Sequence, residues 1–255
     1  MKEKIREYAM TLGADVVGFA AAADYSSKKA PDLKKILPTV QSLIVLGYRE
    51  LDGSLESPNL RTGMTARLGV MDLIKKNNYL LARYIEDNFH AKTAPVAPSY
   101  PLDMAPPVFG LTGDMSLRHT AVAAGLGVFG RHNLVINPKY GTRIVFSAFL
   151  TELPLTSDQT ITEELCDNCN LCVESCPAKA LDEEGKTDAM KCLRVSQPNG
   201  IGGAISYIKK FIGASPDEQK KLLADPRLFS LYQAMFIGFE YHCFRCMIVC
   251  PAGRT

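Results

Sequence analysis

The spacing of the cysteines constrains this chain more than any other feature of its sequence. Between residues 166 and 176, four cysteines follow the pattern C-x2-C-x2-C-x3-C, and Pro177 comes next. With this spacing, three thiolates on a tight turn bind three corners of one iron–sulfur cluster, while the fourth points toward a second cluster. A partner run is therefore expected. Residues 243–251 supply it as C-x2-C-x3-C-P, with Glu240 in the place of a further cysteine.

The number of cysteines matches two four-iron clusters, because each such cluster takes four thiolates and the chain has eight. Cys192 stands alone between the two runs and can replace the ligand that position 240 lacks. The ligands predicted for one [4Fe-4S] cluster are Cys166, Cys169, Cys172 and Cys250. The ligands predicted for the other are Cys176, Cys192, Cys243 and Cys246.

Disulfides and zinc are the alternatives to clusters. A disulfide framework is typical of short secreted chains, whereas a chain of 255 residues can bury a core without such bridges. Structural zinc sites favour paired C-x2-C knuckles rather than a triple run that ends in Cys-Pro. The spacing therefore favours iron–sulfur clusters.

The composition is that of an ordinary soluble globular protein, with 47% hydrophobic and 22% charged residues. The net charge of +2 gives no basis for non-specific binding to nucleic acid. No apolar run is long enough to cross a membrane. Acidic residues interrupt the basic N-terminus, which predicts a helix and a strand rather than an export signal. A cytoplasmic location suits free thiolates.

Hydrophobic periodicity predicts the elements of the N-terminal part. The expected helices are residues 2–12, a short one within Pro31–Pro38, and Thr65 to about Phe89; the expected strands are Asp15–Ala20, Ser42–Tyr48, Leu134–Asn137 and Arg143–Thr151. Asn77–Asn78 interrupts the long helical pattern, so a break is expected there.

A proline-rich segment, Ala94–Pro107, should be extended, because proline lacks an N–H donor and restricts the residue before it. It suits a surface connector and a wall of a site equally well. Asp114 or Ser116 can cap a helix that runs to about Ala124.

Two domains are expected: an α/β core at residues 1–158 and a two-cluster domain at residues 159–255. The second carries a helical insertion at about residues 198–238, with helices predicted at Ile201–Ile212, Pro216–Leu223 and Pro226–Phe236. We expect this insertion to pack over the clusters.

The glycines at positions 125, 127 and 130 formally match the dinucleotide pattern G-x-G-x-x-G. They follow a predicted helix and precede strands, which is the wrong context for that fold, and the charged residues after them are basic. The glycines instead indicate close backbone approach, either to another element or to a flat ligand. Each basic residue around them suits a solvated surface. Together, Arg118, His119, Arg131, His132 and Arg143 suit an anionic or amide-rich cofactor.

A family resemblance rests on five segments. Residues 118–136 (RHTAVAAGLGVFGRHNLVI) resemble the AGLG-x-x-G-[KR]-[HN]-x-L segment of epoxyqueuosine reductases and corrinoid-dependent reductive dehalogenases. Residues 146–155 (FSAFLTELPL) are similar to their FLGE-x-L-x-D-x-PL stretch, and residues 188–192 (DAMKC) to DA-x-x-C. Residues 243–251 match the family's second cluster half, and residues 36–45 resemble a family strand.

This resemblance implies a base-off cobalamin between a nitroreductase-like α/β core and a two-cluster bacterial-ferredoxin-like module, an α+β fold overall. Electrons would pass through two [4Fe-4S] clusters to the cobalt, which reduces the substrate. The turn Gly125–Gly130 would lie against the corrin or its tail. The residues implied in cobalamin binding are Arg118, His119, Gly125, Leu126, Gly127, Gly130, Arg131, Asn133 and Arg143.

Three features differ from the epoxyqueuosine reductase pattern. Leu111 stands near the place of the family's catalytic Asp, the nearest acid is Asp114, and Leu117 replaces the Glu before Arg118. The chain ends at Thr255, where longer family members continue into a helical-repeat region that helps to grip tRNA. The span from Cys192 to Cys243 is longer than usual. These differences predict a short form that acts on a small molecule, with tRNA not expected as a partner.

The first functional hypothesis is a cobalamin-dependent reductase supplied by an external donor of the ferredoxin or flavodoxin type. Asp114 is its candidate proton donor, with Tyr48, Tyr100 and Arg118 as secondary candidates; Asp114 is more simply explained as a helix N-cap. The second hypothesis is a ferredoxin-like electron-transfer or corrinoid-binding protein without substrate chemistry of its own. The sequence does not predict an oligomeric state.

Overall fold

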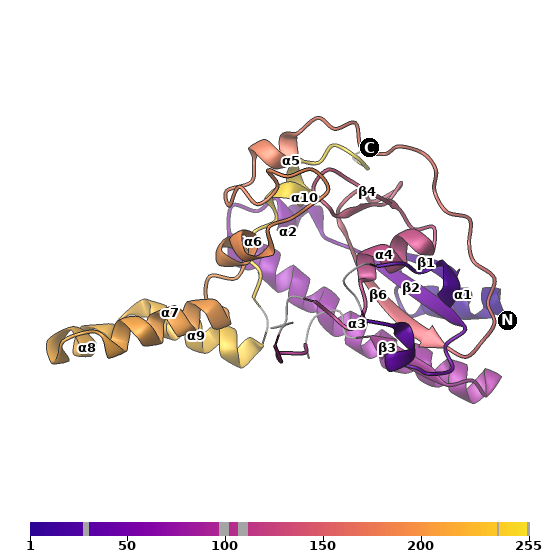
Figure 1. Cartoon of the computed structure of the whole chain (residues 1–255), viewed down its shortest axis with the longest axis horizontal. Helices are drawn as coiled ribbons and strands as arrows, with labels where there is room; N and C mark the ends of the chain where they lie inside the picture. The colour runs from indigo at the N-terminus through magenta and orange to yellow at the C-terminus, as the bar shows by residue number, and fades with distance from the viewer. Residues whose placement is uncertain (28–30, 97–101, 107–111, 239, 254–255) are drawn as a thin grey trace.

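The centre of the fold is a four-stranded antiparallel sheet with the strand order β1–β2–β6–β3 (Figure 1). The computed structural model describes residues 1–27, 31–96, 102–106, 112–238 and 240–253. The strands are β1 (Val16–Ala21), β2 (Ser42–Arg49), β6 (Ile144–Thr151) and β3 (Thr93–Val96). β2 and β6 pair from Ser42 opposite Thr151 to Arg49 opposite Ile144, so they form the middle of the sheet.

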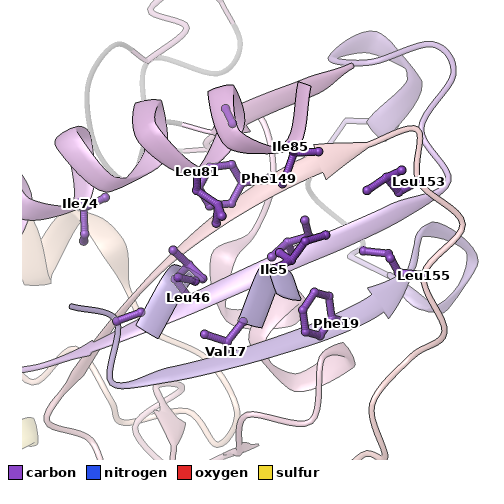
Figure 2. Packing of buried hydrophobic residues seen from close by; sticks show 14 of the residues in the cluster. Ile5, Val17, Phe19, Leu46, Ile74, Leu81, Ile85, Phe149, Leu153 and Leu155 are labelled. Carbon is purple, nitrogen blue, oxygen red and sulfur yellow. The ribbon is translucent and has the colours of Figure 1, made fainter. Parts of the chain in front are cut away.

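β2 is apolar at almost every position because helices cover both faces of the sheet. Ile44 and Leu46 lie on the face that packs against α1 (Lys2–Thr11) and α3 (Leu60–Phe89), as Figure 2 shows for Leu46. Leu43 and Val45 lie on the opposite face, which is covered by α4 (Leu117–Ala123). Each buried side chain of this kind stabilises the fold by about 1.5–3 kcal/mol.

The long helix α3 shows that the predicted break at Asn77–Asn78 is wrong. The helix is continuous, and both asparagines are buried. The Asn77 side-chain amide donates to the Leu12 carbonyl at 2.8 Å and to the Tyr48 hydroxyl at 3.2 Å. Because these bonds satisfy a buried amide, Asn77 joins α3 to the end of α1 and to β2.

The proline-rich segment contributes the edge strand β3, in which Pro95 lies opposite Phe149 of β6. An edge strand tolerates proline because one side of its backbone needs no ladder partner. The rest of the prediction for this segment falls partly on residues 97–101 and on Pro107, which lie outside the described residues.

Several shorter elements complete the core and the cysteine-rich part. The strand predicted at Leu134–Asn137 is the shorter β5 (Val135–Ile136), and it pairs with an unpredicted strand, β4 (Val128–Phe129). The helix expected within Pro31–Pro38 is only a 3-10 turn, η2. The other short elements are η1 (Ala22–Asp24), η2 (Leu33–Lys35), α2 (Asp52–Leu55), α5 (Leu171–Glu174), α6 (Ala189–Ser196) and α10 (Arg245–Val249).

The insertion between Cys192 and Cys243 forms the three predicted helices, α7 (Ile201–Ile212), α8 (Pro216–Leu223) and α9 (Pro226–Ile237). They extend away from the sheet as an arm, seen at the left of Figure 1. The expectation that the insertion packs over the clusters is therefore wrong. At the base of the arm, the Glu240 carboxylate accepts bonds from the backbone and side chain of Asn199, both at 2.7 Å.

The mixed helix-and-sheet architecture confirms the α+β class. Within the described ranges, no helix is both long enough and apolar enough to cross a membrane.

Candidate iron–sulfur site

Cysteines from the two runs meet at one cavity. In the first run, Asn168 and Asn170 adopt left-handed backbone conformations (φ 55° and 61°), which asparagine tolerates and which turn the chain tightly before α5. A cavity of about 250 Å³ lies against this turn. Four cysteines line it: Cys166, Cys169, Cys172 and Cys250. These are the four that the spacing assigns to one cluster.

The second run reaches this cavity because the core holds its backbone. α10 packs against α5, and the two lie side by side at the top of Figure 1. The Thr142 hydroxyl donates to the Met247 carbonyl at 3.0 Å, and the Arg143 guanidinium donates to the Ile248 carbonyl at 3.1 Å. The residues just before β6 thus satisfy carbonyls at the end of α10 and position Cys250.

The other four cysteines lie close enough for their charges to interact. Burial, together with the charges of the nearby Cys243, Cys192 and Cys176, raises the pKa of the Cys246 thiol to about 12. Burial and the charges of Cys243 and Cys176 likewise raise the pKa of Cys192. When these buried thiols ionise, their negative charges repel one another. Positive charge must offset this repulsion, and the iron ions of an iron–sulfur cluster supply it.

The donor chemistry of the first cavity fits a cluster better than a single ion. All eight cysteines are free, so no disulfide links them. Across the described ranges of the chain, no three His, Cys, Asp or Glu side chains converge on a single-ion site. A four-iron cluster instead needs four thiolates arranged around a cavity. Four thiols around about 250 Å³ meet that requirement.

A buried charge supports the second run from the side of α3. The Arg67 guanidinium forms an ion pair with Glu50, whose side chain is fully buried. The same guanidinium lies 5.2 Å from the ring centroids of both Tyr241 and Phe244. Its Nη2 also lies 3.7 Å from the Met247 sulfur. Sequence reasoning missed Arg67 and Glu50, because nothing in the local pattern distinguishes them from exposed charges.

His132 lines the cavity and has a buried ring N–H without a partner among the described residues. The residue is only 3% exposed. Its Nδ1 accepts from the Leu134 N–H at 3.0 Å, which assigns the proton of a neutral ring to Nε2. Burial lowers the pKa of His132 to about 4, so the ring is neutral at pH 7. Nε2 has no hydrogen-bond partner among the described residues.

The glycines of the Gly125–Gly130 turn lie close to other residues of the same chain. A Cβ atom on Gly125 would lie 2.3 Å from the Gln159 carbonyl oxygen, and one on Gly127 would lie 2.4 Å from the Ile136 carbonyl oxygen. A Cβ on Gly130 would meet the His132 ring at 2.6 Å. Of the two explanations that the sequence left open, these contacts support approach to another element.

Arg118 and His119, both on α4, also bond within the chain. Arg118 donates to the Asn133 carbonyl, and burial lowers the pKa of its guanidinium. The His119 Nδ1 lies 2.7 Å from the Ser116 hydroxyl, and burial lowers the pKa of this ring too. Leu126, another predicted contact of cobalamin, is buried in the core.

Arg131 and Arg143 lie beside the cysteine runs. The Arg131 backbone N–H donates to the Cys166 sulfur at 3.3 Å, and its guanidinium donates to the Glu183 carbonyl at 3.1 Å. Arg143 is buried and forms ion pairs with Asp52 at 2.9 Å and Glu56 at 3.0 Å. Both arginines therefore join the core to the cysteine-rich part.

The candidate proton donors lie in different surroundings. Asp114 is exposed, and the N-cap of α4 is Ser116, so the N-cap explanation of Asp114 is wrong. Tyr48 is 1% exposed within the sheet core, and burial raises its pKa to about 12. This tyrosine bonds to Asn77 and has no access to solvent. Tyr100 and Leu111 lie outside the described residues.

Comparisons with known proteins agree with the cysteine pattern. Residues 160–182 match the model of the 4Fe-4S binding domain. An epoxyqueuosine reductase from Staphylococcus aureus is 28% identical over 284 residues, which cover 100% of this chain and 65% of the relative. The resemblance to epoxyqueuosine reductases is confirmed. The chain thus spans slightly less than two thirds of the length of this relative.

Solved structures extend the likeness to the fold. An epoxyqueuosine reductase crystallised with an epoxyqueuosine-modified tRNA-Tyr stem loop superposes with a TM-score of 0.65 at 20% identity, covering 99% of this chain and 65% of that one. A reductive dehalogenase whose structure suggests a mechanism for B12-dependent dehalogenation gives 0.58 at 20% identity, covering 76% and 28%. The overall architecture of this chain therefore recurs in both groups.

The expectation against tRNA as a partner is wrong. An epoxyqueuosine reductase whose structure covers 99% of this chain was solved with a modified tRNA stem loop. The near-neutral net charge that argued against nucleic acid says little about a specific site, because a few local contacts can bind one stem loop without a strongly basic surface.

Proposed function

We propose that this chain is an iron–sulfur reductase of the epoxyqueuosine reductase type, which acts on a modified nucleoside of tRNA. The observation that carries the proposal is the cavity of about 250 Å³, lined by thiols from both cysteine runs. The similarity to epoxyqueuosine reductases along the whole chain supports the reaction class and the substrate class.

In this proposal, Cys166, Cys169, Cys172 and Cys250 hold one [4Fe-4S] cluster, and the remaining four cysteines hold a second. Clusters of this kind supply one-electron transfer when bound. The protein supplies the thiolates and a nearby N–H donor, from the Arg131 backbone. Such donors stabilise negative charge on cluster sulfur, and so make the cluster easier to reduce.

Cobalamin is less well supported by the residues predicted to hold it. The Gly125–Gly130 turn packs against the chain itself, the Arg118 guanidinium is bonded to the Asn133 carbonyl, and Leu126 is buried in the core. These residues do not fit a corrin ring, so we derive no step through cobalamin. A nitroreductase-like character of the core stays part of the proposal.

A second candidate is an electron-transfer protein without substrate chemistry of its own. It is favoured by the surroundings of the predicted proton donor. Asp114 is exposed, and Leu117 stands where the family has a glutamate. A donor on an open surface exchanges protons with water instead of delivering one to a shielded substrate.

One experiment separates the two candidates. The full chain is purified without oxygen, its iron is measured, and it is incubated with dithionite and an epoxyqueuosine-modified tRNA stem loop, with and without added cobalamin. We expect about eight iron atoms per chain and conversion of the modified nucleoside, detected by mass spectrometry after digestion. A protein with Cys250→Ser serves as the control that lacks one cluster ligand.

Full iron content without conversion of the nucleoside, and without a shift of the corrinoid absorbance, would favour the electron-transfer protein. Iron content near zero after reconstitution would reject both candidates.

A further inference from the structure

The arm has a small apolar core of its own. Tyr207 of α7, Leu222 of α8 and Leu231 of α9 are buried against one another. The Tyr207 hydroxyl donates to the Leu222 carbonyl, and Gly203 lets α7 approach the Pro198 carbonyl. The three helices therefore hold together without the apolar side chains on their outer faces.

Those outer faces carry regular apolar stripes. On α7, isoleucines occur at positions 201, 205, 208 and 212, and their exposed fractions run from 47% to 72%. On α9, Phe229, Tyr232 and Phe236 are 58%, 62% and 80% exposed. The Tyr232 and Phe236 rings stack with centroids 6.3 Å apart, so these two side chains share one face.

The spacing of both stripes is that of a coiled-coil seam. The intervals are 4, 3 and 4 residues on α7, and 3 and 4 residues on α9, which place the side chains at successive a and d positions of a heptad. The seam on α7 is narrow, because Ser206 and Lys210 occupy the far side of that helix. On α9, Met235 and Ile237 are also exposed, beside the stripe. A helix that lies on a membrane presents a broad apolar face, so the pattern on α7 fits another helix.

We propose that the arm is a dimerisation element, which packs against the arm of a second copy of this chain. In a two-fold dimer each stripe meets an equally apolar stripe, so the same surface of both copies is removed from water. From the exposed fractions, the large apolar side chains of α7 and α9 offer roughly 1,000 Å² per copy, and a stable complex needs about 800 Å².

The charges of the arm fit the same partner. Residues 201–237 contain five basic and three acidic side chains. This near balance gives no strong attraction for anionic lipid or nucleic acid. It also imposes little repulsion between two arms.

The test measures the mass of the full chain with its clusters, by sedimentation velocity without oxygen at 1–50 μM. We expect a species near twice 27.9 kDa. Changing Ile205 and Ile208 together to Glu should give a monomer with unchanged iron content. Ser206→Glu is the matched control, since it adds a charge on the far side of the same helix and should leave the dimer intact.

A second variant covers the case in which two glutamates unfold the arm. Changing Ile205 and Ile208 together to Ala keeps helix propensity and should raise the dissociation constant of the dimer at least tenfold. A wild-type monomer at 50 μM would overturn the proposal. So would a monomer that binds vesicles of anionic phospholipid, because the stripes would then serve a membrane.

Discussion

At the scale of single residues, the first cavity is defined by what faces the sulfur atoms. The Arg131 N–H lies 3.3 Å from the Cys166 sulfur. The His132 ring belongs to the same lining, and its buried Nε2 has no partner among the described residues. A reduced cluster carries one more negative charge than an oxidised one. Donors at the cavity therefore stabilise the reduced form more than the oxidised form.

Replacing His132 by Leu should lower the reduction potential of the cluster at Cys166. The variant removes the Nε2 donor while keeping an apolar side chain in a buried position. We expect a shift of tens of millivolts, where about 59 mV corresponds to a tenfold change for one electron. The measurement is a redox titration followed by electron paramagnetic resonance.

The other cluster serves as the internal control for this variant, because His132 lines the cavity of Cys166, Cys169, Cys172 and Cys250. Equal shifts of both potentials, or no shift in either, would contradict the role assigned to the His132 N–H.

At the scale of elements, α3 contacts two separate parts of the molecule along its length. Its C-terminal half packs on the sheet through Ile74, Leu81 and Ile85 (Figure 2). Its N-terminal half presents Arg67 to the aromatic rings that precede and follow Cys243. A single rigid helix therefore sets the distance between the core and the second cysteine run, and a break at Asn77–Asn78 would have uncoupled them.

Replacing Asn77 by Ala should destabilise the protein by about 2 kcal/mol, because the Leu12 carbonyl and the Tyr48 hydroxyl lose a buried partner. Asn88→Ala is the matched control on the same helix. Asn88 is exposed and bonds only to the Tyr84 carbonyl of its own helix at 2.9 Å. Its loss should cost less than about 0.5 kcal/mol. Urea unfolding of the two variants provides the comparison, and equal losses would show that Asn77 has no special role.

At the scale of the whole molecule, the end of the chain closes onto the core turn before β6. Gly141 has a left-handed backbone (φ 55°), and a Cβ there would lie 1.9 Å from the Ala252 carbonyl oxygen. Together with the bonds from Thr142 and Arg143, this contact seats the segment that ends in Cys250. The first cavity is therefore completed only when residues far apart in the chain pack together.

Replacing Gly141 by Ala should displace this segment and remove one cluster. We expect the iron content to fall from about eight to about four atoms per chain, measured by metal analysis after reconstitution. Gly185→Ala is the control, since Gly185 also has a left-handed backbone (φ 66°) but nothing within 4 Å of the added Cβ. Both variants bear the same backbone strain of about 1–2 kcal/mol. Equal iron contents would show that the contact with Ala252 does not hold the cluster site.

The sequence predicted those features that depend on neighbours along the chain. The strand at residues 42–48 and the three helices of the arm follow from periodicity and turn residues, and the structure has them. Asn77 was misjudged because a buried asparagine with two partners and an exposed one that breaks a helix look the same in sequence. The glycines at 125 and 127 were ambiguous for the same reason, since their Gln159 and Ile136 neighbours are set by packing.

By itself, the sequence determined that this chain carries two cysteine runs with cluster spacing, because the geometry of a cluster-binding turn is encoded within a dozen residues. Only the tertiary structure decided that Arg118 and Arg143 are engaged by the chain itself, and that the arm projects outward. These outcomes depend on which residues, far apart in the chain, pack together. Such contacts produce no periodic pattern along the sequence.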